Sequence, residues 1–194
     1  MTVSRILQTI SISTVLGACA SAPEPMLYVL DSAAPNNDKA ASDILIGLNE
    51  VRLPSYARDQ KITSLDGRNR VIKDGDHRWA SPPEEAFTNK LAATLEDETG
   101  ARVLVRPIPS GLSTDYNLTV SLDAMLRGQA GEAIVRGQYV IVGLEDSFHL
   151  DRFEFSIAPD SQDYDGFMRG VSVALENLCA QIDDELDHLA ARSF

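Results

Sequence analysis

The chain has 194 residues, of which 29 are Asp or Glu and 17 are Lys or Arg, so its formal net charge is −12. This acidic balance argues against nucleic acid as a partner, because such binding neutralises phosphates with basic side chains. It also argues against a basic face for anionic lipid head groups. The length suits one domain with a substantial hydrophobic core.

Residues 1–18 have the pattern of a secretory signal peptide. Arg5 precedes a run of apolar and hydroxyl residues that is too short to span a bilayer, which needs about 20 residues. The run ends in Leu16-Gly17-Ala18-Cys19, which resembles the lipobox of bacterial lipoproteins. That resemblance implies cleavage after Ala18, with a diacylglycerol on the Cys19 thiol and an acyl chain, such as palmitate, on its new amino group. The alternative is a plain signal peptide in which Cys19 has no role.

Two acyl-bearing groups on Cys19 would hold the mature chain stably on a membrane without a transmembrane helix. Ala20 follows the cysteine, whereas Asp in that position retains enterobacterial lipoproteins at the inner membrane, so we expect the outer membrane. Loss of residues 1–18 removes one Arg and no acidic residue, which leaves a net charge of −13. Cys179 would then be the single free thiol, so an internal disulfide is excluded.

The mature chain begins with an acylated tether, residues 19–26, and continues as one domain, residues 27–194. A short apolar run from Met26 to Leu30 predicts the first strand. The alternating apolar residues from Ile44 onward predict a second strand, which ends at Leu53-Pro54.

A hairpin is predicted around Asp66-Gly67, a dipeptide that tolerates the positive φ angles of tight turns. Its strands are residues 62–65 and 70–73, and a second Asp74-Gly75 pair is expected to end it. A helix is then predicted over about 82–98.

For this helix, Ser81 and Glu84 fit a capping box, and Gly100 is placed to end the helix. Apolar residues recur within it at Phe87, Leu91 and Leu95.

Three longer strands follow a short one at 102–106. The first covers about 117–124, with its inward-facing residues expected to be Leu118, Val120, Leu122 and Ala124. The other two cover 133–144 and 148–157. In the last strand the apolar phase shifts between Leu150 and Phe153, which predicts a β-bulge near Asp151-Arg152.

A long amphipathic helix is predicted over about 164–191. Its apolar stripe is Met168, Val171, Leu175, Leu178, Ile182, Leu186 and Leu189. Together these elements predict an α+β fold, an antiparallel sheet with the two main helices packed on one face.

No arrangement typical of catalysis occurs in the sequence. It lacks the Gly-x-Ser-x-Gly, phosphate-loop and His-Glu-x-x-His motifs. The three histidines, His77, His149 and His188, do not have the spacing of metal ligands, and the acidic run 183–187 fits a solvated helix face better than a cation site. We therefore expect no enzyme, no catalytic residue, no metal and no cofactor other than the covalent lipid on Cys19.

Five short motifs stand out along the chain. They are Leu27-Tyr28-Val29-Leu30, Val51-Arg52-Leu53-Pro54-Ser55-Tyr56-Ala57-Arg58, Gln60-Lys61-Ile62, Arg78-Trp79-Ala80-Ser81-Pro82 and Asp163-Tyr164-Asp165-Gly166. In this order and spacing they resemble the ABC-type transport auxiliary lipoproteins, the PqiC-like family, over nearly all of the mature chain. Two positions depart from the family pattern: Ala57 stands where Leu is common, and Ser81-Pro82-Pro83 replaces the usual Glu-Pro-Leu.

The resemblance implies an outer-membrane lipoprotein on the periplasmic side. It would act as a non-enzymatic docking subunit for an MCE-domain membrane protein of a lipid-transport or membrane-integrity system. Association with further copies of the same chain stays open. The partner-binding candidates are Tyr56, Arg58, Arg78 and Trp79, because aromatic residues and Arg are enriched where partners dock.

Two alternatives stay open at this point. One is that Trp79 is a core aromatic beside a salt-bridged Arg78 at the entry to the helix. The other is that the domain is a direct lipid carrier that binds an acyl chain between the sheet and the terminal helix, which would require an apolar pocket of several hundred Å³.

Overall fold

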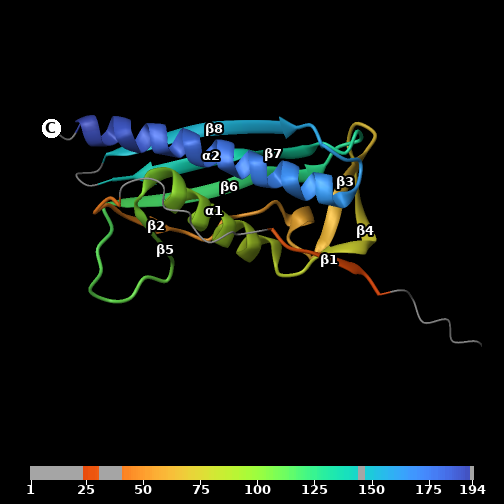
Figure 1. The fold of residues 1–194 in the computed structure, drawn as a ribbon, viewed down its shortest axis with the longest axis horizontal. Helices are drawn as coiled ribbons and strands as arrows, with labels where there is room; N and C mark the ends of the chain where they lie inside the picture. Colours follow the sequence, from red (N-terminus) through yellow and green to blue (C-terminus); the bar gives the residue numbers. More distant parts are fainter. Residues whose placement is uncertain (1–23, 31–40, 144–146, 193–194) are drawn as a thin grey trace, which may run out of the picture.

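The computed structural model describes residues 24–30, 41–143 and 147–192. They form one eight-stranded sheet and two long helices (Figure 1). The elements in chain order are β1 (Met26–Tyr28), β2 (Leu45–Leu48), the 3-10 helix η1 (Ser55–Ala57), β3 (Lys61–Asp66), β4 (Arg70–Trp79), α1 (Pro83–Thr99), β5 (Arg102–Val105), β6 (Tyr116–Arg127), β7 (Ala133–Val142), β8 (Phe148–Ile157) and α2 (Tyr164–Arg192). The α+β class predicted from the sequence is confirmed.

The central strand of the sheet is β6, which pairs with β2, β3 and β7. The path across the sheet is β1-β4-β3-β6-β2-β5, and β7 and β8 continue from β6. β2 lies beside the start of β6, with Ile46 opposite Tyr116, and β3 lies beside its end, with Ser64 opposite Arg127. The inward residues predicted for β6 are all buried.

The sheet is mixed, which corrects the prediction of an antiparallel sheet. β3–β4, β6–β7 and β7–β8 are antiparallel, as expected for strands joined by short turns. β1–β4, β2–β5, β2–β6 and β3–β6 are parallel. These four pairs join strands that are separated by other elements, and the direction in which such distant strands meet is not encoded in their local pattern.

The predicted hairpin is present, but its second strand is longer than expected. Gly67 has a φ of 73° in the turn between β3 and β4, a value that favours glycine. β4 does not end at Asp74-Gly75. It continues to Trp79, because His77 to Trp79 pair with β1.

The bulge predicted in β8 is absent. The β7–β8 register runs without a shift from Ala133 opposite Ile157 to Val142 opposite Phe148. Phe148 and Leu150 are 71% and 54% exposed, so these two apolar side chains point to the solvent face and the apparent change of phase does not exist. The irregularity in this part of the sheet lies instead in β6, between Leu122 and Ala124.

The start of α1 also differs from the prediction. Pro82 is the N-cap residue and no side chain caps the helix, so Ser81 does not form the expected capping box. Glu84 instead accepts a hydrogen bond from the Leu53 N–H and pairs with Arg58. The predicted end is confirmed: Gly100 has a φ of 66°, and its N–H donates to the Glu96 carbonyl.

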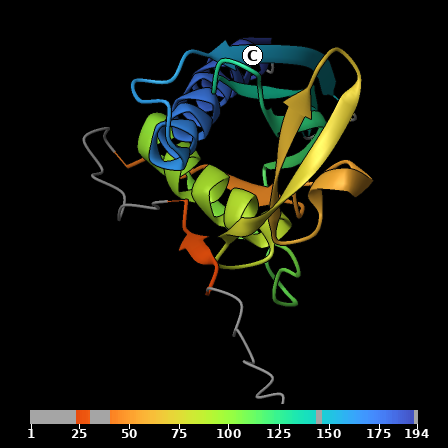
Figure 2. The same cartoon turned by 90° about the vertical axis from the view of Figure 1, so that its right-hand side faces the viewer.

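Both helices lie on one face of the sheet, as predicted. Figure 2 shows the curved sheet wrapping around them. Every residue of the predicted α2 stripe is buried, and the core between the helices and the sheet contains Trp79, Phe87 and Phe167. Trp79 packs edge-on against both phenylalanines, with ring centroids 6.0 and 6.4 Å apart.

In the part of the chain that the structure describes, no helix has both the length and the apolar character needed to cross a membrane.

Candidate functional site

Of the four residues that the motifs single out for partner binding, Trp79 lies in the core. It ends β4 with 1% of its surface exposed, and its backbone N–H donates to the Gln60 carbonyl at 2.7 Å. Its packing against Phe87 of α1 and Phe167 of α2 ties both helices to the sheet. We therefore leave Trp79 out of the contact residues considered below.

Arg58 lies on the surface just after η1 and connects this turn to α1. Its Nε donates to the Leu53 carbonyl at 3.1 Å and lies 3.4 Å from Glu84 Oε1. The same carboxylate oxygen accepts a hydrogen bond from the Leu53 N–H at 3.3 Å. The side chain of Arg58 is nevertheless 58% exposed, so it is accessible to a partner.

Tyr56 and Arg78 are partly buried and each donates to a backbone carbonyl. The Tyr56 hydroxyl donates to the Asp123 carbonyl at 3.4 Å, and burial raises the pKa of Tyr56 above its usual range. Arg78 Nε donates to the Gly75 carbonyl at 3.2 Å. The structure thus gives these motif residues internal contacts as well as partial exposure.

Cys19 and Ala18 lie outside the described residues, so lipid attachment and cleavage there stay predictions.

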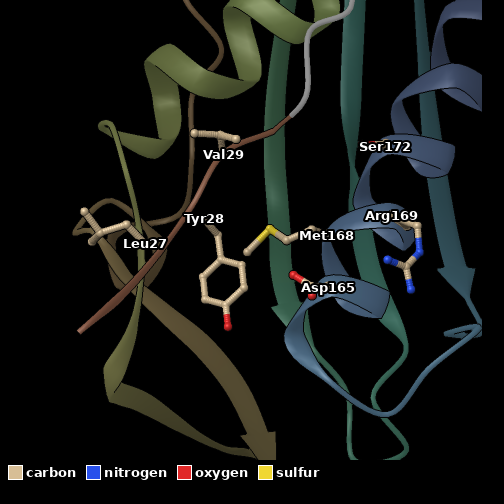
Figure 3. A pocket seen from close by; sticks show the side chains of 7 residues that line it. All are labelled: Leu27, Tyr28, Val29, Asp165, Met168, Arg169 and Ser172. Carbon is tan, nitrogen blue, oxygen red and sulfur yellow. The ribbon is translucent and has the colours of Figure 1, made fainter. Parts of the chain in front are cut away.

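A pocket of about 290 Å³ lies between β1 and the first turns of α2, and sequence reasoning did not point to it. Figure 3 shows the Tyr28 side chain directed toward Met168 and Asp165, while the side chains of Leu27 and Val29 point to the other side of the strand. This alternation follows from the period of two in an extended strand. The pocket is lined by Leu27, Tyr28, Val29, Asp165, Met168, Arg169 and Ser172.

A cluster of ring side chains lies beside this pocket and joins β1, β4 and α2. The Tyr28 hydroxyl is 2.7 Å from His77 Nδ1, and the His77 ring stacks on Tyr164 with centroids 3.8 Å apart. The Arg127 guanidinium carbon lies 5.3 Å from the Tyr164 ring centroid, within cation–π range. The cluster therefore holds the N-terminal strand against the start of α2.

The Tyr164 hydroxyl donates to Asp74 Oδ2, which anchors the cluster to β4. Burial alone would raise the pKa of Asp74, but hydrogen bonds from the Tyr164 hydroxyl and from the backbone N–H groups of Asp76 and His77 outweigh it and lower that pKa. Burial and the bond to Asp74 raise the pKa of Tyr164 to about 12. The pair is thus held as a neutral tyrosine and an ionised aspartate.

Arg169 forms the rim of the pocket and is held by an acidic neighbour. Its Nε and Nη2 donate to the two carboxylate oxygens of Asp160 at 2.7 and 2.6 Å, and Nη2 also donates to Ser161 Oγ at 3.0 Å. The bond from Arg169 lowers the pKa of Asp160. The rim arginine is therefore already paired with a carboxylate.

Among the described residues, no group of three or more His, Cys, Asp or Glu side chains is placed to hold a metal ion. The arrangement at β1 offers apolar surface, a pocket at the surface and a cluster of ring side chains beside it. These features are suited to binding.

Two of the motifs noted in the sequence supply this pocket: Leu27-Tyr28-Val29-Leu30 and Asp163-Tyr164-Asp165-Gly166. They are about 135 positions apart, and their contact depends on the parallel pairing of β1 with β4. The sequence marked both segments as motifs. It did not show that they lie side by side, because local patterns carry no information on which distant segments meet.

A family model described as "ABC-type transport auxiliary lipoprotein component" matches residues 28–183 of this chain. The matched range includes both motifs at the pocket from Tyr28 onward, the η1 turn and most of α2. No curated protein has a sequence that matches this chain.

Two solved structures have a similar fold. One is a crystal structure described only as an uncharacterized protein; it is 17% identical, and the match covers 84% of this chain and 99% of that one with a TM-score of 0.71. The other is protein XCC0632 from Xanthomonas campestris, described under the family DUF330; it is 12% identical, with 84% and 99% coverage and a TM-score of 0.63. At these identities the likeness shows a shared fold.

Proposed function

Because the chain belongs to the family of ABC-type transport auxiliary lipoprotein components, we propose that it serves a transport system as a non-enzymatic docking subunit anchored to the outer membrane. The anchor is the lipid on Cys19, and the domain lies on the periplasmic side. The partner is an MCE-domain membrane protein of a lipid-transport or membrane-integrity system. The observation that carries the proposal is the family match over residues 28–183.

The packing between α2 and the sheet supports docking over lipid carriage. A carrier of the kind considered above would hold an acyl chain between these layers. That space is occupied by side chains with 0–2% of their surface exposed, among them Val171, Leu175, Leu178 and Ile182 of α2. The pocket at β1 lies at the surface, and its volume of about 290 Å³ is at the lower end of the roughly 300–1,000 Å³ typical of ligand sites.

The anchor is tested by Cys19→Ser in the full chain. Serine offers no thiol for the diacylglycerol, so we expect the variant to lack acyl label, to keep its signal peptide and to be lost from the outer-membrane fraction. Metabolic labelling with an acyl analogue and fractionation of the envelope measure this. Equal labelling of variant and wild type would refute the assignment of Cys19.

The docking surface is tested at the three motif residues whose side chains are exposed or partly exposed. We expect Arg58→Glu, Arg78→Glu and Tyr56→Ala to reduce co-purification of the partner, because Tyr and Arg are enriched among the few interface residues that contribute most of the binding energy. Arg68→Glu, which makes the same charge change in the β3–β4 turn, is the matched control and should keep the partner bound.

Arg58 needs one further control because it also contacts Glu84. Glu84→Gln weakens that ion pair without changing the charge at position 58. If Arg58→Glu loses the partner and Glu84→Gln keeps it, with equal melting temperatures, Arg58 itself contacts the partner. Binding that survives all three surface substitutions in folded protein would place the interface elsewhere.

A further inference from the structure

Exposed apolar residues in and directly after β1 lie where the chain arrives from the predicted anchor. Met26, Leu27 and Val29 are 56%, 62% and 68% exposed, although they occupy three of four consecutive positions. Leu27 and Val29 lie on the side of the strand opposite Tyr28, which turns inward to His77, whereas Met26 lies on the Tyr28 side, with its Sδ 3.9 Å from the Tyr28 hydroxyl. Grouped exposed apolar side chains mark surfaces that contact another apolar phase or partner.

The length of the tether limits how far this strand can be from the bilayer. Met26 is seven positions after Cys19, a reach of at most about 25 Å when fully extended. α2 begins beside the β1 pocket and runs for 29 residues toward the other end of the molecule, about 40 Å away at 1.5 Å per residue (Figure 1). The β1 end is therefore the end next to the membrane.

The charges at this end do not favour an electrostatic attraction to anionic lipid. Acidic residues outnumber basic ones there, and the rim arginine, Arg169, is bound by Asp160. The acidic residues in or next to β1, β4 and the start of α2 are Glu24, Asp74, Asp76, Asp160, Asp163 and Asp165, and the basic residues there are Arg70, Lys73, Arg78 and Arg169. A contact with the bilayer would therefore depend on apolar side chains and suit zwitterionic head groups.

We propose that Leu27 and Val29 insert into the head-group region of the bilayer that holds the acyl chains of Cys19, as a second, non-covalent membrane contact. This inference rests on the proposed function, since the acyl chains bring β1 to the bilayer. The contact covers the side of β1 away from the sheet and directs α2 away from the membrane. The opposite end of the domain is then the part that faces the periplasm.

The test uses the full acylated chain, reconstituted in phosphatidylcholine vesicles, with a nitroxide spin label at one position. Leu27→Cys is the probe. Leu112→Cys is the matched control, because Leu112 is 54% exposed and lies in the β5–β6 loop at the other end of the molecule (Figure 1). Native thiols do not interfere, since Cys19 is acylated and Cys179 is buried.

The readout is the accessibility of each label to oxygen, which concentrates in bilayers, and to a water-soluble nickel complex. We expect the oxygen-to-nickel ratio to be several-fold higher at position 27 than at position 112. We also expect this difference to persist in high salt, because an apolar contact is not screened. Equal ratios at the two positions would overturn the inference.

Three outcomes separate the possible failures. A label at position 27 that is protected from both oxygen and nickel would mean that protein covers β1, as a second copy or a partner, and would overturn the lipid contact. A protein mass without acyl chains would refute the proposed anchor itself. An acylated protein with a water-exposed label at position 27 would refute only the contact made by β1.

Discussion

Tyr164 joins three elements through its side chain: it donates to Asp74 of β4, stacks on His77, and lies under Arg127 of β6. The residue opens α2, so these contacts determine where the helix begins to cross the sheet. The same side chains form the ring cluster beside the β1 pocket.

We predict that Tyr164→Phe destabilises the domain by roughly 1 kcal/mol at neutral pH, the usual net worth of one hydrogen bond. The lowered pKa of Asp74 means that its contribution is present above its unfolded value, about 4, and is lost as pH falls through the folded value. The raised pKa of Tyr164 means that its contribution is lost as pH rises from about 10 toward 12.

Urea unfolding across this pH range measures the effect. The difference between wild type and Tyr164→Phe should be largest between about pH 5 and pH 9 and should shrink at both extremes. Tyr116→Phe, at the start of β6 and outside the cluster, is the control. A difference that does not change with pH would show that the Asp74 bond does not contribute to stability.

Cys179 is buried in α2, where its Sγ lies 3.9 Å from the Leu91 carbonyl of α1. Burial raises the pKa of its thiol far above the usual range, so the reactive thiolate is scarce. We predict that Ellman's reagent modifies the acylated native protein only as fast as the domain unfolds and reacts at once in urea. Rapid modification without denaturant would contradict this structural role.

At the scale of the elements, the start of α1 has no capping side chain, and side chains of its first two turns bind the segment around η1 instead. Glu84 accepts from the Leu53 N–H and pairs with Arg58, and Thr88 Oγ1 accepts from the Val51 N–H at 2.9 Å. These contacts fasten the chain around η1 to the helix. The motif around Pro54 thus has a structural use that does not depend on any partner.

We therefore predict that Glu84→Ala costs about 1 kcal/mol, since it leaves the Leu53 N–H without this acceptor. Ser81→Ala should stay within about 0.5 kcal/mol of wild type, the range of surface substitutions away from special features. The free energies of unfolding in urea decide between them. A larger loss of unfolding free energy in Ser81→Ala than in Glu84→Ala would indicate that Ser81 does cap the helix, contrary to the structure.

β7 pairs with β6 at close range around Gly137, which lies opposite Leu122 where the register shifts between Leu122 and Ala124. A Cβ at position 137 would lie 2.2 Å from the Ser121 carbonyl oxygen and 2.9 Å from Leu122 Cα, so backbone would have to move.

We predict that Gly137→Ala lowers the free energy of unfolding by about 1–3 kcal/mol through overpacking. Gly75→Ala in β4, where a Cβ would meet no atom within 4 Å, is the matched control and should be nearly neutral. Thermal melts of the two variants provide the comparison. Equal melting temperatures would mean that β6 and β7 are less close than the structure has them.

At the scale of the whole molecule, the short N-terminal strand is part of the fold as well as the continuation of the tether. Tyr28 belongs to the ring cluster, the Tyr28 carbonyl accepts from the Ala80 N–H at 2.7 Å, and Leu30 is buried.

We predict that a chain beginning at Glu24 unfolds in one cooperative urea transition. A chain beginning at Ala41 should be less stable by about 2 kcal/mol or more, because the burial of one leucine alone contributes roughly 1.5–3 kcal/mol. Circular dichroism during unfolding measures both. Equal stability of the two chains would mean that β1 lengthens the tether without stabilising the fold.

The sequence by itself determined the elements whose patterns are local. The seven-residue stripe of α2, the end of α1 at Gly100, the Asp66-Gly67 turn and the inward residues of β6 depend on side-chain periods and on the conformations that glycine permits. The family motifs are also local, so the sequence alone indicated the family.

Only the tertiary structure decided the features that depend on residues far apart in the chain. The parallel pairs of β1, β2 and β3, the extension of β4 to Trp79 and the meeting of Tyr28 with Tyr164 all require strands to find distant partners. The exposure of Phe148 and Leu150 likewise depends on what covers each face of β8. Such pairings are decided by the burial of the whole core, in which each strand satisfies its backbone groups wherever its apolar face is covered best.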